Sequence, residues 1–265
     1  MIDATVNGVK FSDIGLGLIR HNIPVLPPTN DYTLEIAGRD GEINFGSSYQ
    51  ARTFELECVV MANDPTLDYH AKIANIAGLF NAKRGELEIT FSDLPGRRYM
   101  ARYAGSMEIE KLLFDGNVTI PLKMDDPYVQ SLYDTKAKEY GQGLEYGQLY
   151  EYSDYSVQIS SSSQSFTIRN TGNVDAAPTI RISGAFTNLS LSDGHNVLTI
   201  TDTCTASDVY EIDGHHYTVK KNGINAYAKS NGVFFTIPPG ATTFISTATN
   251  PDFKVEVIFR HKYLY

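Results

Sequence analysis

The chain has 265 residues, of which 42% are hydrophobic and 20% charged, so it can bury a substantial core and is not an intrinsically disordered protein. Its formal net charge of −9 is the wrong sign for a protein that binds duplex DNA, which needs a basic surface. Its two cysteines, Cys58 and Cys204, lie far apart and in no paired motif, which argues against a disulfide framework or a structural zinc site.

Apolar and polar side chains alternate through most of the first half of the chain, which predicts β-strands. In the run ARTFELECVVM, residues 51–61, every second side chain is apolar, and Cys58 is expected to be a small buried hydrophobe. The segment from residue 21 to residue 31 contains three prolines and is predicted to be an extended loop or arm. Further strands are predicted at residues 4–18 (two strands around Asn7-Gly8), 32–37, 86–91, 99–103, 107–110 and 118–124.

One segment, residues 64–84, has the period of an amphipathic helix. Asp64 is expected to cap it, with Pro65 as the first helical residue, and Gly85 is expected to end it. Because neither a lone helix nor a sheet can bury its apolar face alone, the helix is predicted to lie across a sheet. The candidate helix core is one stripe of four residues: Tyr69, Ile73, Ile76 and Phe80.

Composition divides the chain into two domains. Residues 1–127 form the first, and residues 128–164, rich in Tyr, Gly and Ser, are interpreted as a junction that packs in part on a protein surface. Residues 165–265 show short alternating segments separated by turn residues, with no helical pattern, which predicts a β-sandwich. Its predicted strands are 166–169, 179–183, 189–191, 197–201, 209–213, 217–220, 233–237, 243–246 and 254–260.

The sequence carries no motif of a hydrolase, a metalloprotease, a nucleotide-binding loop or a thioredoxin-type site. Asp213-Gly214-His215-His216 offers one carboxylate and two imidazoles to a metal ion. Adjacent side chains on a strand point to opposite faces, so the imidazoles are not expected to converge, and a hairpin turn is favoured. No catalytic residue, metal site or cofactor is predicted.

Several stretches in order resemble one protein family. They are GRDGEINFGSSYQARTFELECVV, the helix, GELEITFSDLPGRRYMARY, EIDGHHYTVKKNGINAYAKSNGVFFTIPPGATTF and the final KVEVIFRHKYLY. Asp126-Pro127, at the end of the first domain, fits the same pattern. Together they cover essentially the whole chain and are similar to the distal tail proteins (Dit) of long-tailed phages and prophages of Gram-positive bacteria.

The resemblance implies a mainly β chain. Its N-terminal domain would be a tail-tube-like β-sandwich or split barrel with one flanking helix, and its C-terminal domain a galectin-like β-sandwich. It implies a homohexameric ring at the tip of the virion tail, made in the bacterial host cytoplasm without a targeting signal. This baseplate hub joins the major tail tube protein to the tail-associated protein, supports receptor-binding proteins, and lets genomic DNA pass through its lumen.

The alternative function is a host-surface carbohydrate- or receptor-binding module acting through the C-terminal sandwich. Galectins stack sugars on tryptophan, and this chain has none, although tyrosine can substitute. An enzyme is the third possibility, and nothing in the sequence resembles a catalytic constellation. The structural hub is preferred.

Glutamates alternate with apolar residues in three predicted strands of the first domain, so that each pair faces away from the core. If those strands share one sheet in a ring, an acidic face would line the channel and repel passing DNA. The other interpretation is that they are ordinary solvated positions outside the ring. The candidate channel-facing residues are Glu55, Glu57, Glu86, Glu88, Glu108 and Glu110.

Overall fold

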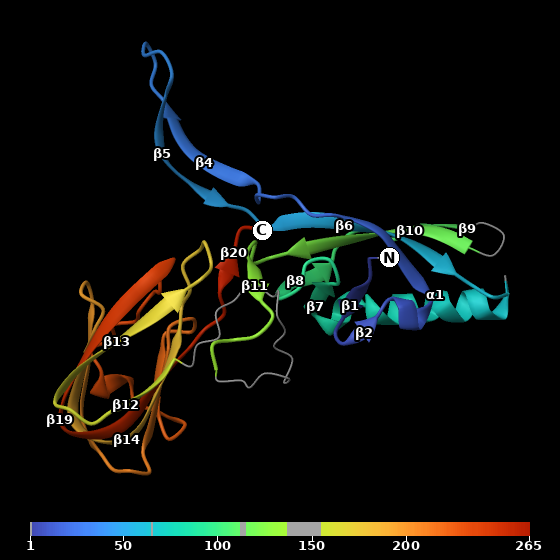
Figure 1. Cartoon of the computed structure of the whole chain (residues 1–265). Helices are drawn as coiled ribbons and strands as arrows, with labels where there is room; N and C mark the ends of the chain where they lie inside the picture. Colours follow the sequence, from blue (N-terminus) through green and yellow to red (C-terminus); the bar gives the residue numbers. More distant parts are fainter. Residues whose placement is uncertain (1, 65, 112–114, 137–154) are drawn as a thin grey trace. The chain divides into compact units, whose positions relative to one another are not determined.

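The computed structural model describes residues 2–64, 66–111, 115–136 and 155–265 (Figure 1). It contains two compact units, Met1–Gln130 with Leu264–Tyr265, and Ser131–Tyr263. The described residues form strands β1 to β20 and one α-helix, so the predicted mainly β fold with a single flanking helix is confirmed.

The first unit is built on a continuous antiparallel sheet in the order β2-β1-β7-β8-β10-β6-β3, with β9 paired to β10. Its strands are β1 (Ala4–Val6), β2 (Val9–Lys10), β3 (Leu16–Asn22), β6 (Arg52–Met61), β7 (Leu87–Phe91), β8 (Arg97–Tyr103), β9 (Ile109–Lys111) and β10 (Asp115–Met124). The short β11 (Val129–Ser131) follows β10, and β20 (Lys262–Tyr263) lies near the end of the chain.

The sheet curls, as a split barrel does. His21 Nε2 on β3 lies 2.8 Å from Asp93 Oδ2, just beyond β7, and the His21 ring lies 4.7 Å from that of Phe91. The alternating apolar residues of β6, β7, β8 and β10 fill the interior, where Tyr99 meets Phe91 and Phe54 at 5.3 and 6.2 Å between ring centroids. Cys58 is buried there, and burial raises the pKa of its thiol to about 12, so the prediction of a small buried hydrophobe is confirmed.

Helix α1 (Leu67–Leu79) is shorter than the predicted 64–84 at both ends (Figure 1). Asp64 accepts from the backbone N–H of Thr66 at 2.6 Å, and so forms a turn ahead of the helix, while Pro65 lies outside the described residues. At the other end Asn81 accepts from the backbone N–H of Lys83 and starts a separate 3-10 turn, Ala82–Arg84. Gly85, at φ +84°, ends that turn rather than the helix.

Strands β4 (Thr29–Glu35) and β5 (Glu42–Tyr49) form a two-stranded sheet of their own, here called the β4–β5 arm. The predicted loop or arm at residues 21–31 is therefore shorter than expected. Strand β3 continues to Asn22 and β4 begins at Thr29, so only residues 23–28 are without strand structure.

The second unit is a sandwich with the sheet order β12-β19-β14-β16-β17-β18, to which β13 adds through β19 and β15 through β14. Its inner face is a continuous apolar core running from Tyr155 to Phe259. The strands are β12 (Ser156–Ile159), β13 (Ser163–Asn170), β14 (Thr179–Ser192), β15 (Val197–Cys204), β16 (Val209–Asp213), β17 (Thr218–Lys221), β18 (Ile224–Asn225) and β19 (Gly240–Ile258).

Two long strands replace four predicted short ones, because β14 covers both 179–183 and 189–191 and β19 covers both 243–246 and 254–260. Each bends, and its two halves pair with different strands: β14 first with β16 and then with β15. Gly184 marks the bend, with φ +127° and no room for a Cβ, which would lie 2.5 Å from the Asp252 carbonyl oxygen. The strand predicted at 233–237 is wrong, since only a single bridge at Ile237 forms there.

The predicted junction, 128–164, is also too long. Strand β12 and the start of β13 belong to the sandwich, and the unit boundary falls after Gln130. Tyr155 packs on Phe259 with parallel rings 5.9 Å apart, whereas residues 137–154 lie outside the described residues.

A fragment that begins at Ser131 is expected to be soluble, β-rich and monomeric, because its strands close a core without any residue of the first unit. Far-UV circular dichroism and light scattering after gel filtration measure both properties. Hexamers recovered from this fragment would contradict the expectation that assembly belongs to the first unit.

Candidate assembly surfaces

The outer face of the first-unit sheet carries four of the six glutamates singled out in the sequence. Glu55 and Glu57 lie on β6, Glu88 on β7 and Glu110 on β9. The strand registers place these four on one face of the continuous sheet. The other two, Glu86 and Glu108, are exposed just before β7 and β9, outside the strands.

That face carries basic as well as acidic side chains, so it is less acidic than the alternation of glutamates alone predicts. Arg20 on β3 forms an ion pair with Glu57, and Arg98 on β8 lies 2.8 Å from Glu88. The hydrogen bond and charge of Glu57 raise the pKa of the Arg20 guanidinium above its ordinary value. Arg102 and Lys123, opposite each other on β8 and β10, are positive as well, and Asp125 pairs with them at 2.8 and 3.9 Å. Alternation predicted which way each glutamate faces, but it could not predict which side chains the neighbouring strands place beside it.

The β4–β5 arm has one apolar and one polar side. Alternation and register put Tyr32, Leu34 and Ile36 on one face with Ile43, which pairs with Leu34. The opposite face carries polar and acidic positions: Asp31, Thr33, Glu35, Glu42, Asn44 and Ser47.

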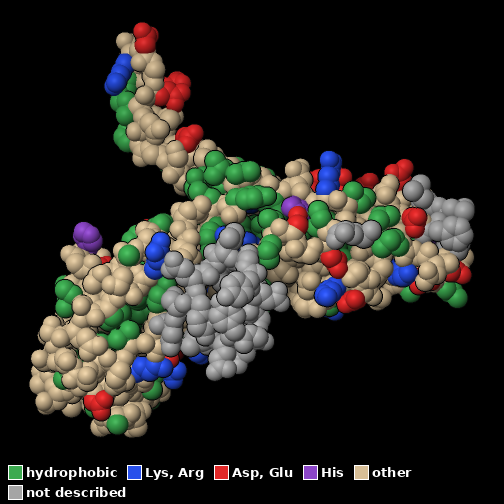
Figure 2. Space-filling view, in the orientation of Figure 1, with side chains coloured by type: hydrophobic (Ala, Val, Ile, Leu, Met, Phe, Trp, Pro, Cys, Tyr) green, Lys and Arg blue, Asp and Glu red, His purple; other side chains and the backbone are tan. Residues whose placement is uncertain are grey.

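Large apolar side chains on the arm are exposed to solvent. Leu34 is 50% exposed and Phe45, at the bulge in the hairpin, 68%. Figure 2 shows hydrophobic side chains gathered along one side of the arm and acidic ones on the other. An exposed apolar face of this kind is typical of a surface that is buried in an assembly. Sequence alternation predicted the strand at Tyr32, but alternation carries no sign of whether its apolar face is covered.

The predicted helix stripe points into the first unit. Tyr69, Ile76 and Phe80 are buried, and Ile73 is half-buried. Phe80 contacts Phe11 edge to face at 6.1 Å between ring centroids. Beside the helix lies a groove of about 330 Å³, lined by Ile73, Ile76, Ala77, Phe80, Asn81, Ala82, Tyr103, Met107 and Ile109.

The Asp213–His216 segment is a turn at the end of β16, as expected. Asp213 Oδ1 accepts from the backbone N–H of His215 and His216, and its Oδ2 lies 2.7 Å from His216 Nδ1. Burial acts to raise the pKa of Asp213, but the bonds from His216 and the two amides outweigh it and hold the pKa low. The rings of His215 and His216 meet edge to face at 4.7 Å, so the two do not point to opposite faces as expected.

Among the described residues, no cluster of three or more His, Cys, Asp or Glu side chains is arranged to hold a metal ion. None of the helices described is long and apolar enough to cross a membrane.

Comparison with known proteins agrees with this architecture. Residues 9–124 match the phage tail protein RIFT-related domain, and residues 171–263 match the C-terminal domain of the siphovirus-type tail component. The distal tail protein of Bacillus phage SPP1 is 26% identical over 238 residues, covering 86% of this chain and 83% of that protein.

Among solved structures, the crystal structure of SPP1 Dit, described as a paradigm of the hub adsorption apparatus in phages infecting Gram-positive bacteria, matches with a TM-score of 0.74. It covers 99% of both chains at 19% identity and shows that the fold is shared. A chain of the phage P2 baseplate is a more distant match, with a TM-score of 0.47 at 9% identity over 99% of this chain and 98% of that one. With two tail-protein domains in tandem and the whole fold in common, the chain belongs to the siphovirus distal tail protein (Dit) family, whose members are structural proteins of phage tails.

Proposed function

We propose that six copies of the chain close into a ring at the distal end of a phage tail. The ring links the tail tube to the tail-associated protein, supports the receptor-binding proteins, and leaves a central channel for genomic DNA. The observation that carries this proposal is the β4–β5 arm, whose apolar residues find no cover within the described part of the chain.

An arm that packs on the body of the next copy makes a head-to-tail contact, in which the two copies use different surfaces. Contacts of that kind generate closed rings when the rotation between copies closes. The SPP1 relative is described as part of a hub, which fits such a ring.

Native mass spectrometry of the purified full chain tests the proposal. A mass of six copies, or a multiple of six, is expected, and negative-stain images should show rings with a central opening. A chain that stays monomeric or dimeric up to high micromolar concentration, with no rings, would rule out a ring that closes by itself.

We further propose that the sheet face with Glu55, Glu57 and Glu110 lines the channel, with Glu86, Glu88 and Glu108 as the remaining candidates. The arginines found on this face reduce its charge but leave Glu55 without an ion pair among the described residues. A wall without excess positive charge gives phosphates no sites to bind, so DNA is not held.

Replacing both Glu55 and Glu57 by lysine is expected to leave the ring intact and to slow DNA ejection from assembled virions. Each substitution shifts the local charge by two units, six copies multiply the shift, and Arg20 loses its partner. The delay should grow at low salt, where screening is weak. Ejection is followed by fluorescence of a DNA-binding dye, with Asp13→Lys plus Asp175→Lys, both exposed and off this face, as the charge-matched control. Ejection at the normal rate at low salt would place these glutamates outside the channel.

A further inference from the structure

The outer face of the sandwich sheet in the second unit carries charged side chains that alternate in sign across four strands. Glu256 on β19, Arg181 on β14, Glu211 on β16 and Lys220 on β17 are successive cross-strand partners. Pairs of this kind stabilise an exposed antiparallel sheet, and that role accounts for the row itself. It does not account for the pocket above the row.

Lys136 brings another cation over this face from outside the sheet. The preceding Thr135 is buried, and its backbone N–H donates to the Phe259 carbonyl at 2.9 Å. Its hydroxyl donates to the Val257 carbonyl at 2.8 Å and accepts from the Phe259 N–H at 3.0 Å. These three bonds fasten the segment to β19, so Lys136 starts from a fixed backbone position.

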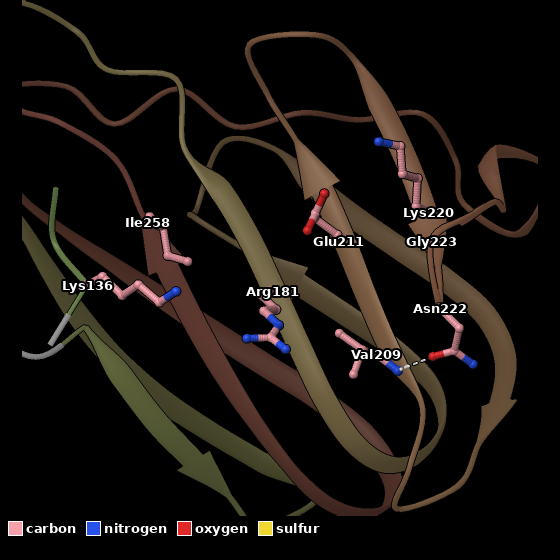
Figure 3. Close-up of a pocket in the computed structure, with 8 residues that line it drawn as sticks. All are labelled: Lys136, Arg181, Val209, Glu211, Lys220, Asn222, Gly223 and Ile258. Carbon is pink, nitrogen blue, oxygen red and sulfur yellow. Dashed lines mark hydrogen bonds between the residues drawn. The ribbon is translucent and has the colours of Figure 1, made fainter.

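The resulting pocket has a volume of about 390 Å³. Figure 3 shows Lys136 and Lys220 on opposite sides of Arg181 and Glu211. Apolar side chains, Val209 and Ile258, complete this part of the lining. A neighbouring hairpin closes the pocket with Asn222 and Gly223, and the Asn222 side chain is held by the backbone N–H of Val209 at 2.9 Å.

Positive charge exceeds negative charge in and around this pocket, although the whole chain carries −9. Glu256 already has Lys254 at 3.0 Å and Arg181 at 3.6 Å. Neither Lys136 nor Lys220 has an ion pair among the described residues. Two ammonium groups, and the half-exposed guanidinium that Arg181 shares with Glu256, therefore surround a single carboxylate of the lining, that of Glu211.

We propose that this pocket binds a phosphorylated polyol, such as a glycerol phosphate or sugar phosphate unit. The phosphate lies between the Lys136 ammonium group and Arg181, which are suited to phosphate oxygens, while Lys220 attracts it from the far side of Glu211. The polyol hydroxyls donate to the Glu211 carboxylate, and the C–H face of the polyol covers Val209 and Ile258.

The mixed charge of the lining excludes simpler ligands. A neutral sugar leaves the Lys136 and Lys220 ammonium groups without a partner, while a bare polyphosphate or a DNA backbone is repelled by Glu211 and offers it no hydroxyl donor. The pocket lies wholly in the second unit, so the proposal does not depend on ring formation.

Titration of the full chain with glycerol 3-phosphate, followed by isothermal calorimetry at low ionic strength, tests the proposal. Saturable binding that weakens as salt rises is expected. Glycerol, and duplex DNA at an equal concentration of phosphate, should each bind at least tenfold more weakly. Absence of saturable binding, or equal binding of DNA, overturns it.

Lys136→Ala with Lys220→Ala is expected to weaken glycerol 3-phosphate binding at least tenfold. Both side chains are exposed, so the fold and its melting temperature should not change. Lys10→Ala with Lys83→Ala removes two exposed lysines of the first unit and serves as the charge-matched control. Equal weakening in the two double variants overturns the site, since only overall charge would then matter.

Glu211→Gln separates this ligand from a plain anion. It is expected to strengthen binding of inorganic phosphate several-fold and to reduce the preference for glycerol 3-phosphate over inorganic phosphate. An unchanged preference would show that Glu211 does not contact the polyol and would overturn that assignment. Titration with soluble poly(glycerol phosphate) and with phosphatidylglycerol vesicles then shows whether a polymer or a lipid headgroup presents the unit.

Discussion

Replacing Ile76 by aspartate is expected to unfold the first unit at ordinary temperature. Ile76 is 1% exposed on the inward stripe of α1, and its surroundings are apolar. An aspartate there buries a carboxylate without a partner, or must be protonated, and either costs several kcal/mol. Because a domain of this kind is stable by only about 5–15 kcal/mol, most of the margin is lost.

Thermal melting of the full chain, followed by circular dichroism, measures the effect. Loss of the first-unit transition is expected, while the sandwich melts as before. The matched control is Ala74→Asp, which places the same group on the exposed side of the helix two residues earlier and should cost well under 1 kcal/mol. Ile76→Val, which changes shape but not charge, should cost about 0.5–1.5 kcal/mol. If Ile76→Asp melted like the unchanged chain, the helix could not be packed as described.

The helix shows how far the sequence could predict this structure. Periodicity found the inward stripe because burial requires it, and Tyr69, Ile76 and Phe80 are all inside. Both ends of the helix were misplaced because the residues expected to cap it belong to other turns. Asp64 and Gly85 serve a preceding turn and a 3-10 turn instead of the helix.

In the sandwich, two positions that fall between the predicted strands lie inside long strands of the structure. Asn188 and Asn250 have positive φ, as turn residues do, yet each lies inside a long strand. Whether such a residue ends a strand or bends it depends on which strands pair with the residues on either side of it. Those pairing strands come from distant parts of the sequence.

The assembly surfaces depend even more on distant neighbours. The arginines that neutralise Glu57 and Glu88 come from other strands, 37 and 10 residues away in the sequence. The pocket cations on β14, β17 and the segment before residue 137 are separated in the same way. The spacing of residues along the sequence does not show which distant side chains become neighbours, whereas the register of a sheet shows it directly.

Changing Leu34 and Phe45 to aspartate is expected to abolish the ring while leaving the monomer folded. Both side chains are at least half exposed in the single chain, so their loss removes little from its own stability. In a ring each would be buried against a neighbour, where a large apolar side chain contributes about 1.5–3 kcal/mol. Placing charge there replaces that contribution with a desolvation penalty at every one of the repeated contacts.

Native mass spectrometry should therefore report hexamers for the unchanged chain and monomers for the Leu34→Asp, Phe45→Asp variant. The C-terminal sandwich of the variant should show the same melting curve as that of the unchanged chain. The control uses the other side of the same hairpin. Thr29→Asp with Thr33→Asp adds equal charge to the polar face, and hexamers should persist. Since about 1.4 kcal/mol is a tenfold change in affinity, the two variants should differ by orders of magnitude in the concentration at which rings form. Rings that survive the apolar-face variant at the usual concentration would mean that the arm does not hold the copies together.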